Sequence, residues 1–159
     1  MTQENKELLL KDLGARLSHG VKGRVYAEVS DGQYDIMGDL IFYNAPFVVT
    51  LDEINTSTEE IHVIAVGNED TVEFIEEAQQ DGEPYVIDDF KPYLRPMSSM
   101  TEEEKEEFEN LLEGIVDGIE RWDKPDLCEE YDWLNAHHFD YRRLIEKNLA
   151  LEAPKDMYK

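Results

Sequence analysis

The amino-acid sequence predicts a small α+β protein with an N-terminal helix, an antiparallel sheet of four or five strands, and C-terminal helices packed on one face of that sheet. Two changes of hydrophobic period predict this class: helical spacing gives way to alternation after Gly20 and returns after Thr101. No internal repeat or low-complexity linker interrupts the 159 residues. We therefore expect a single domain over residues 1–159, sheet-rich over 1–90 and helical over 91–159.

The first expected element is an amphipathic helix over residues 3–18. Gly20 follows it as a C-terminal stop. Four leucines recur at helical spacing on this segment, namely Leu9, Leu10, Leu13 and Leu17.

Strands are expected next, because apolar and polar residues alternate from Val21 to Val29. Asp31-Gly32 is a typical hairpin turn, and the polar stretch at residues 55–58 is typical of another. The sequence thus predicts an antiparallel meander. Its strands are expected at residues 21–29, 34–43, 47–51 and 61–66, with an edge strand at 85–87.

Two connecting segments follow from local signals. Asp70 and Glu73 resemble a helix cap, which favours a short helix ending before Gly82, although a strand over residues 71–75 is the alternative. Residues 91–96 are expected to be extended, because a proline disfavours helical geometry in the residue before it.

The C-terminal half is expected to be helical. Thr101 and Glu104 form a capping-box pattern that begins a long helix reaching Trp122. Asp126 is expected to cap a second helix and Asp140 a third. The apolar stripe predicted on the long helix comprises Phe108, Leu111, Leu112, Ile115, Val116, Ile119 and Trp122.

Charge is distributed very unevenly along the chain, whose net charge is −23. Residues 25–89 hold 17 acidic side chains and no lysine or arginine. This balance predicts repulsion of nucleic acid and of anionic membranes as direct ligands. A single cysteine, Cys128, and the lack of a secretory signal or an apolar span lead us to expect a cytoplasmic protein.

The sequence offers no catalytic constellation, so we expect no enzyme and no cofactor. His137 and His138 are the only clustered ligand-type residues, but adjacent side chains diverge, and a histidine at a helix C-terminus is the favoured interpretation over a metal site. Phosphate-binding loops, a nucleophile elbow and CxxC are absent. Acidic neighbours would raise the pKa of the Cys128 thiol and oppose its activation.

Two segments are candidates for binding a protein partner. Alternation along the predicted strand 34–43 places Asp35 and Asp39 on one acidic face. Lys91, Tyr93 and Arg95 bring cations and an aromatic ring into a chain that is poor in cations. The alternative for the second segment is a connector whose cations pair with local acids.

Three strings carry a resemblance to a known group of sequences: residues 91–105 (KPYLRPMSSMTEEEK), residues 132–142 (DWLNAHHFDYR) and residues 149–154 (LALEAP). Over roughly residues 91–158 the chain resembles a family of small uncharacterised proteins encoded by gut bacteria of the Bacteroides group and by their phages and mobile elements. The resemblance implies such an origin and carries no catalytic or binding residue.

The favoured function is that of a non-enzymatic acidic interaction protein with an as yet unknown protein partner. One alternative is that the cation-free block mimics nucleic-acid charge and inhibits a basic host or defence protein. Another is a small hydrolase that uses carboxylates with His137 or His138.

Overall fold

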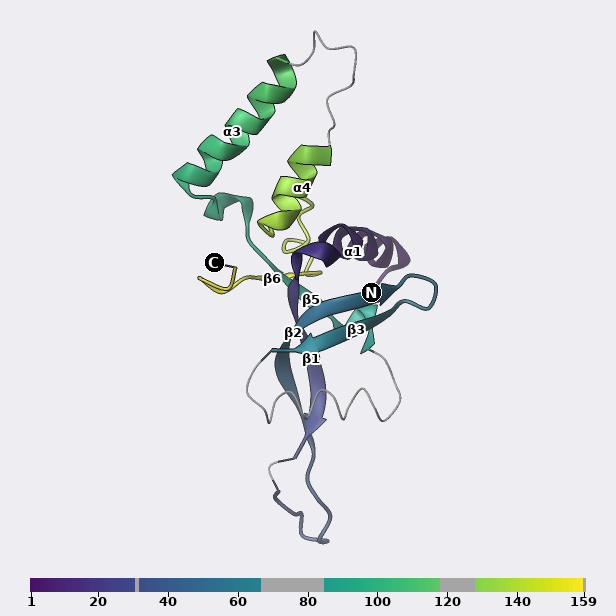
Figure 1. Cartoon of the computed structure of the whole chain (residues 1–159). Coiled ribbons are helices and arrows are strands. Elements are labelled where there is room, and N and C mark those ends of the chain that lie inside the picture. Colours follow the sequence, from purple (N-terminus) through teal and green to yellow (C-terminus); the bar gives the residue numbers. More distant parts are fainter. Residues whose placement is uncertain (31, 67–84, 118–127, 159) are drawn as a thin grey trace. The chain divides into compact units, whose positions relative to one another are not determined.

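The computed structural model describes residues 1–30, 32–66, 85–117 and 128–158 (Figure 1). The chain forms two compact units, Met1–Pro92 and Tyr93–Lys159, whose border lies close to the predicted border between the two halves. The α+β class is confirmed. That the whole chain acts as one domain, and that the C-terminal helices cover the sheet, stay predictions.

The first unit begins with helix α1 (Gln3–Arg16). The Thr2 hydroxyl accepts a hydrogen bond from the Asn5 backbone N–H at 3.3 Å and so caps the helix. A 3₁₀ turn at Leu17–His19 follows, and Gly20 ends the helical segment with a φ of 65°, which favours glycine. The predicted N-terminal helix is confirmed.

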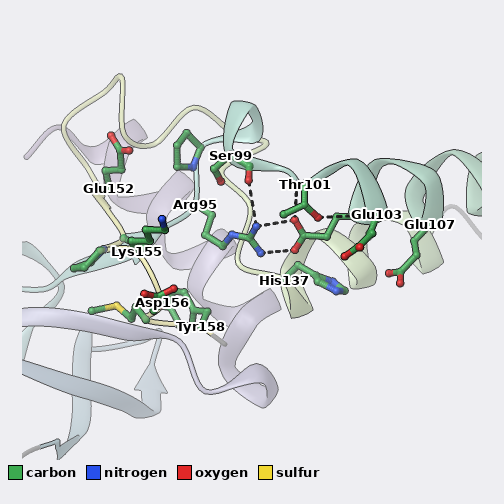
Figure 2. Close-up of a pocket in the computed structure, with 15 residues that line it drawn as sticks. Arg95, Ser99, Thr101, Glu103, Glu107, His137, Glu152, Lys155, Asp156 and Tyr158 are labelled. Carbon is green, nitrogen blue, oxygen red and sulfur yellow. Dashed lines mark hydrogen bonds and ion pairs between the residues drawn. The ribbon is translucent and has the colours of Figure 1, made fainter.

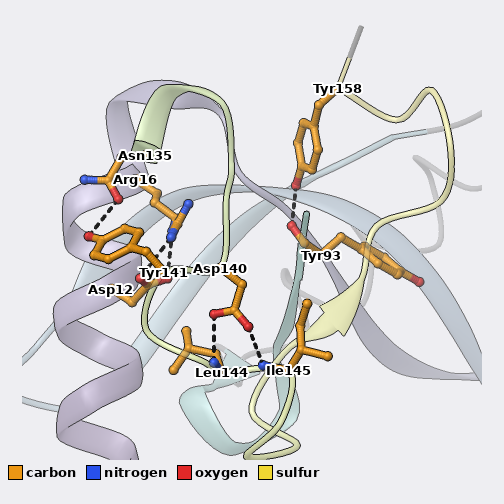
Figure 3. A network of polar contacts seen from close by, with 9 residues as sticks. All are labelled: Asp12, Arg16, Tyr93, Asn135, Asp140, Tyr141, Leu144, Ile145 and Tyr158. Atoms are coloured by element: carbon orange, nitrogen blue, oxygen red, sulfur yellow. Dashed lines mark hydrogen bonds and ion pairs between the residues drawn. The ribbon is translucent and has the colours of Figure 1, made fainter. Parts of the chain in front are cut away.

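One salt bridge of α1 is fully buried. The Arg16 Nε donates to Asp12 Oδ2 at 2.7 Å, one helical turn away, and neither side chain is exposed (Figure 3). Because two charges leave water together, removing only one partner would leave the other buried without its counter-charge.

Four consecutive strands of the first unit pair antiparallel in order, which confirms the predicted meander order but not all of its predicted strands. Strand β5 (Lys91–Leu94) also pairs antiparallel with β1 through Lys91 and Pro92. Its last two residues belong to the second unit, where they pair parallel with β6 (Leu151–Glu152). The described residues therefore contain six strands, more than predicted, and the sheet is mixed. The meander strands are β1 (Lys22–Val29), β2 (Tyr43–Asn55), β3 (Glu60–Ala65) and β4 (Tyr85–Val86).

The predicted strand over residues 34–43 is wrong, and so is the separate strand at 47–51. A single strand, β2, runs from Tyr43 through Pro46 to Asn55, and residues 34–42 form turns with one isolated bridge. Proline fits here because, within the described residues, β2 pairs with β3 only from Val49 onward. At Pro46 its missing N–H costs no ladder bond on that side.

In the core of the first unit, a buried aromatic ring packs directly against a glycine. Phe90 is fully buried, and its ring occupies the space beside Gly23, where an added Cβ would lie 2.2 Å from the ring carbon Cζ. Gly23 pairs with Val49 on one side and with Pro92 on the other. No other residue type fits at position 23 without moving the ring.

Lys6 joins α1 to two other parts of the first unit. Its Nζ lies 2.6 Å from Glu59 Oε2 and 2.7 Å from Asp88 Oδ2. Hydrogen bonds from Lys6 hold the pKa of both carboxyls below their usual values, and both carboxylates in turn raise the pKa of Lys6. The cluster is partly open to solvent, so it orients these segments more than it stabilises them.

The second unit contains helices α3 (Glu102–Asp117) and α4 (Cys128–Ala136). The predicted capping box is confirmed, because the Thr101 N–H donates to Glu104 Oε2 at 2.8 Å and the Glu104 N–H donates to Thr101 Oγ1 at 3.2 Å. Phe108, from the predicted stripe, is half-buried, and the centre of its ring lies 5.2 Å from the centre of the Trp133 ring. Three predictions lie outside the described residues: the helix at 70–82, the end of the long helix at Trp122 and the cap at Asp126.

The predicted last helix after Asp140 is wrong. Residues 141–150 form successive turns, with Arg143 and Asn148 at positive φ. The Asp140 carboxylate accepts hydrogen bonds from the Leu144 and Ile145 backbone N–H groups at 2.7 and 2.9 Å (Figure 3). Asp140 therefore caps a turn and not a helix. Leu144 and Leu149 are buried, although they lie in turns and not on one face of a helix.

We expect Gly23→Ala to lower the free energy of unfolding by about 1–3 kcal/mol, because the new methyl group displaces the Phe90 ring from a closed core. Urea denaturation measures this change. Gly14→Ala is the matched control, since a Cβ at this helical position meets no atom within 4 Å, and it should leave stability unchanged or raise it by up to about 1 kcal/mol. Equal stability of the two variants would contradict the packing described.

Candidate interaction surface

Strands β1 and β2 extend beyond the described part of β3 as a two-stranded ribbon, which we call the arm (Figure 1). The chain between the two strands makes its own small turn, which Tyr34 and Leu40 close with an isolated antiparallel bridge. We call residues 32–42 the arm tip. All of these residues are exposed, so the arm tip contributes little to the core.

Asp35 organises the arm tip. Its Oδ1 accepts hydrogen bonds from the Met37 N–H at 2.7 Å and from the Asp39 N–H at 2.9 Å. The Asp35 N–H donates to the Asp39 carbonyl at 2.8 Å, and Gly38 supplies a φ of 89°. The backbone bonds from Asp39 and Met37 hold the pKa of Asp35 below its usual value. The carboxylate thus fixes a turn and stays ionised.

The arm tip exposes a group of large apolar side chains. Ile36 is fully exposed, Met37 is 80% exposed and Tyr34 is 67% exposed. Isolated apolar residues on a surface are ordinary, but several exposed within one short loop are typical of interaction sites, and we call them the apolar patch. The patch consists of Tyr34, Ile36, Met37, Leu40, Ile41 and Phe42.

The two predicted acidic residues lie in a different local structure from the one predicted. Asp35 and Asp39 are both exposed, as expected, but they lie in a tight turn and not on one face of a strand. The predicted alternation fails because the Asp35 side chain bonds to the backbone in place of a ladder. Sequence reasoning missed the apolar residues, although two features signal them: the adjacent pair Ile36-Met37 and the unbroken run of residues 40–43.

Arg95, one of the three residues predicted in the second segment, has a structural role. Its guanidinium donates to both carboxylate oxygens of Glu104, at 2.7 and 2.8 Å, and lies 4.3 Å from the centre of the Phe139 ring. Its backbone exchanges hydrogen bonds with His138 and Asp140. The pairing with a local acid agrees with the connector alternative.

Lys91 and Tyr93, the other two residues of that segment, are half-buried in β5. Lys91 forms a ladder pair with Arg24 in the first unit. In the second unit, the Tyr93 carbonyl accepts a hydrogen bond from the Tyr158 hydroxyl at 2.8 Å (Figure 3). Tyr93 thus helps to hold the C-terminal segment in place.

A cavity of about 700 Å³ lies beside Arg95 in the second unit (Figure 2). The ion pair with Glu104 compensates the charge of Arg95, and the remaining ionisable groups of the lining are mostly acidic. His137 also lines the cavity, but its Nδ1 lies 2.8 Å from the Trp133 carbonyl oxygen. Its ring therefore bonds to the end of α4, as the sequence indicated, and not to a carboxylate that would make a catalytic pair.

No group of three or more potential metal ligands occurs in the described part of the chain. None of the helices described there combines the length and the apolar character that crossing a bilayer requires. Comparison with protein-family models, with curated proteins and with solved structures gave no match.

The Arg95–Glu104 pair should make stability depend on pH. The hydrogen bond from Arg95 lowers the pKa of Glu104 from 4.5 to about 2. The folded-state pKa is depressed, so the stabilisation is present above about pH 4.5 and is lost as the pH falls through about 2. We expect Glu104→Gln, which keeps a capping side chain, to cost about 1–3 kcal/mol at pH 7 and much less near pH 2.

Urea titrations of wild type and variant at several pH values measure this difference. Glu106→Gln, at an exposed position on the same helix, is the control and should cost nearly nothing at any pH. A cost of Glu104→Gln that does not change with pH would contradict the ion-pair assignment.

Proposed function

We propose that this chain is a non-enzymatic acidic interaction protein that binds another protein through the arm tip. The observation that carries the proposal is the cluster of exposed apolar side chains on a loop that the core does not need. Exposing such side chains to water is unfavourable, and a partner that covers them recovers the hydrophobic free energy.

Charge supports the same surface. The sequence has no lysine or arginine from residue 25 to residue 89, and the carboxylates of Glu28, Asp35 and Asp39 are exposed on the arm. Carboxylates around an apolar patch attract a basic partner at long range, whereas the apolar contact holds it after docking. The enzyme alternative has less support, because the Nδ1 atom of His137 lies against a backbone carbonyl and the ring of His138 stacks on that of Tyr158.

Mimicry of nucleic-acid charge is the competing function, and the cation-free block favours it. The two functions differ in what the apolar patch does. A phosphate mimic depends on carboxylates alone and loses its partner steadily as salt rises. An interaction protein of the kind proposed depends on the apolar side chains and retains part of its affinity in high salt.

We expect a variant whose residues 32–42 are replaced by a short Asn-Gly turn to lose the partner and to keep its melting temperature, because the replaced side chains are exposed. Affinity capture from a lysate of a Bacteroides-group bacterium, the origin that the sequence resemblance implies, tests this when the captured proteins are identified by mass spectrometry. Capture of the same proteins by wild type and variant would contradict the proposal. Complete loss of the partner in high salt would favour mimicry.

A further inference from the structure

The arm tip presents two adjacent apolar residues on a turn that is already fixed. Ile36 and Met37 follow Asp35, whose carboxylate accepts hydrogen bonds from Met37 and Asp39. The Gly38 N–H also donates to the Asp35 carbonyl at 3.1 Å. Because these bonds restrict the backbone before any partner arrives, binding loses less conformational entropy there than on an unstructured loop.

We propose that Ile36 and Met37 are the anchor residues of this surface, and that they insert into an apolar pocket rimmed by lysine and arginine on the partner protein. The inference rests on the proposed function and assigns its binding residues and the chemistry of its partner. Among the residues that the structure describes, Ile36 and Met37 are the two most exposed large apolar ones. Residues that fill a pocket on the partner carry most of the binding energy of an interface.

Charge favours a basic partner protein over a second copy of the chain, an anionic membrane or a nucleic acid. Asp35 and Asp39 flank the anchor pair on both sides, and both are exposed. A second copy of the chain would bring a net charge of −23 against an equal charge, and an anionic membrane or a nucleic acid would also be repelled. A basic rim around an apolar pocket complements both the carboxylates and the anchors.

The probe for this proposal is a synthetic amphipathic helical peptide made of leucine and lysine, labelled with a fluorophore. Its apolar face has a lysine border and so reproduces the partner chemistry. One matched peptide carries serine in place of leucine, and another carries glutamate in place of lysine. We expect fluorescence anisotropy to detect binding of the leucine–lysine peptide, with at least about tenfold weaker binding of each matched peptide.

Variants of the full chain locate the contact. Ile36→Ser combined with Met37→Ser should weaken binding of the leucine–lysine peptide by at least about tenfold. Ile64→Ser is the control, because Ile64 is an exposed apolar residue of β3 outside the arm. Asp35→Asn combined with Asp39→Asn removes the charge and keeps the side chain that forms the turn, so it should mainly slow association.

Four binding results would each overturn the assignment. They are no binding of the leucine–lysine peptide up to millimolar concentration, equal binding of the lysine–serine peptide, unchanged binding by the Ile36/Met37 variant, and stronger binding to zwitterionic lipid vesicles than to the peptide. Self-association of the chain through the arm tip, measured by sedimentation, would also overturn it. If the shortened arm loses a captured protein but the Ile36/Met37 variant retains it, the proposed function stands and the anchor assignment fails.

Discussion

The contact between Phe90 and Gly23 is the constraint on which the first unit depends. A buried aromatic ring occupies the place of a side chain on β1, at a residue that pairs with β2 on one side and with β5 on the other. Three strands are therefore fixed relative to one another at one position. With β1 anchored there, the distal ends of β1 and β2 are free to extend as the arm that carries the exposed apolar residues.

Elements with strong local signals could be predicted from the sequence. The N-terminal helix has a leucine period and a glycine stop, and the Thr101–Glu104 box forms both of its expected hydrogen bonds. Errors arose where a side chain competes with the backbone ladder. Asp35 and Asp140 each bond to two backbone N–H groups and make turns, where alternation predicted a strand and a capping pattern predicted a helix.

The acidic character of the candidate surface could be predicted from the sequence, but its exposed apolar residues could not. Charge can be counted from the sequence, so the exposed carboxylates of Asp35 and Asp39 are expected, although the strand face predicted to carry them is wrong. Exposure depends on the backbone conformation, and strand alternation places Met37 on the acidic face and Ile36 on the opposite face, whereas in the turn both side chains are exposed. Arg95 is the opposite case: the sequence makes it a candidate for binding a partner, but in the structure it contacts groups of its own unit. Its guanidinium pairs with Glu104 and lies over the Phe139 ring.

Pro46 has a consequence for the behaviour of the chain at high concentration. Between Tyr43 and Phe47, the pairing that the described residues show for β2 is with β1. A strand edge with free N–H and C=O groups is a template for chain-to-chain strand addition and for aggregation. Pro46 has no N–H to donate to an added strand, and the acidic charge keeps copies apart. A loop proposed to bind a partner through apolar side chains thus lies next to a residue that disfavours strand addition by further copies.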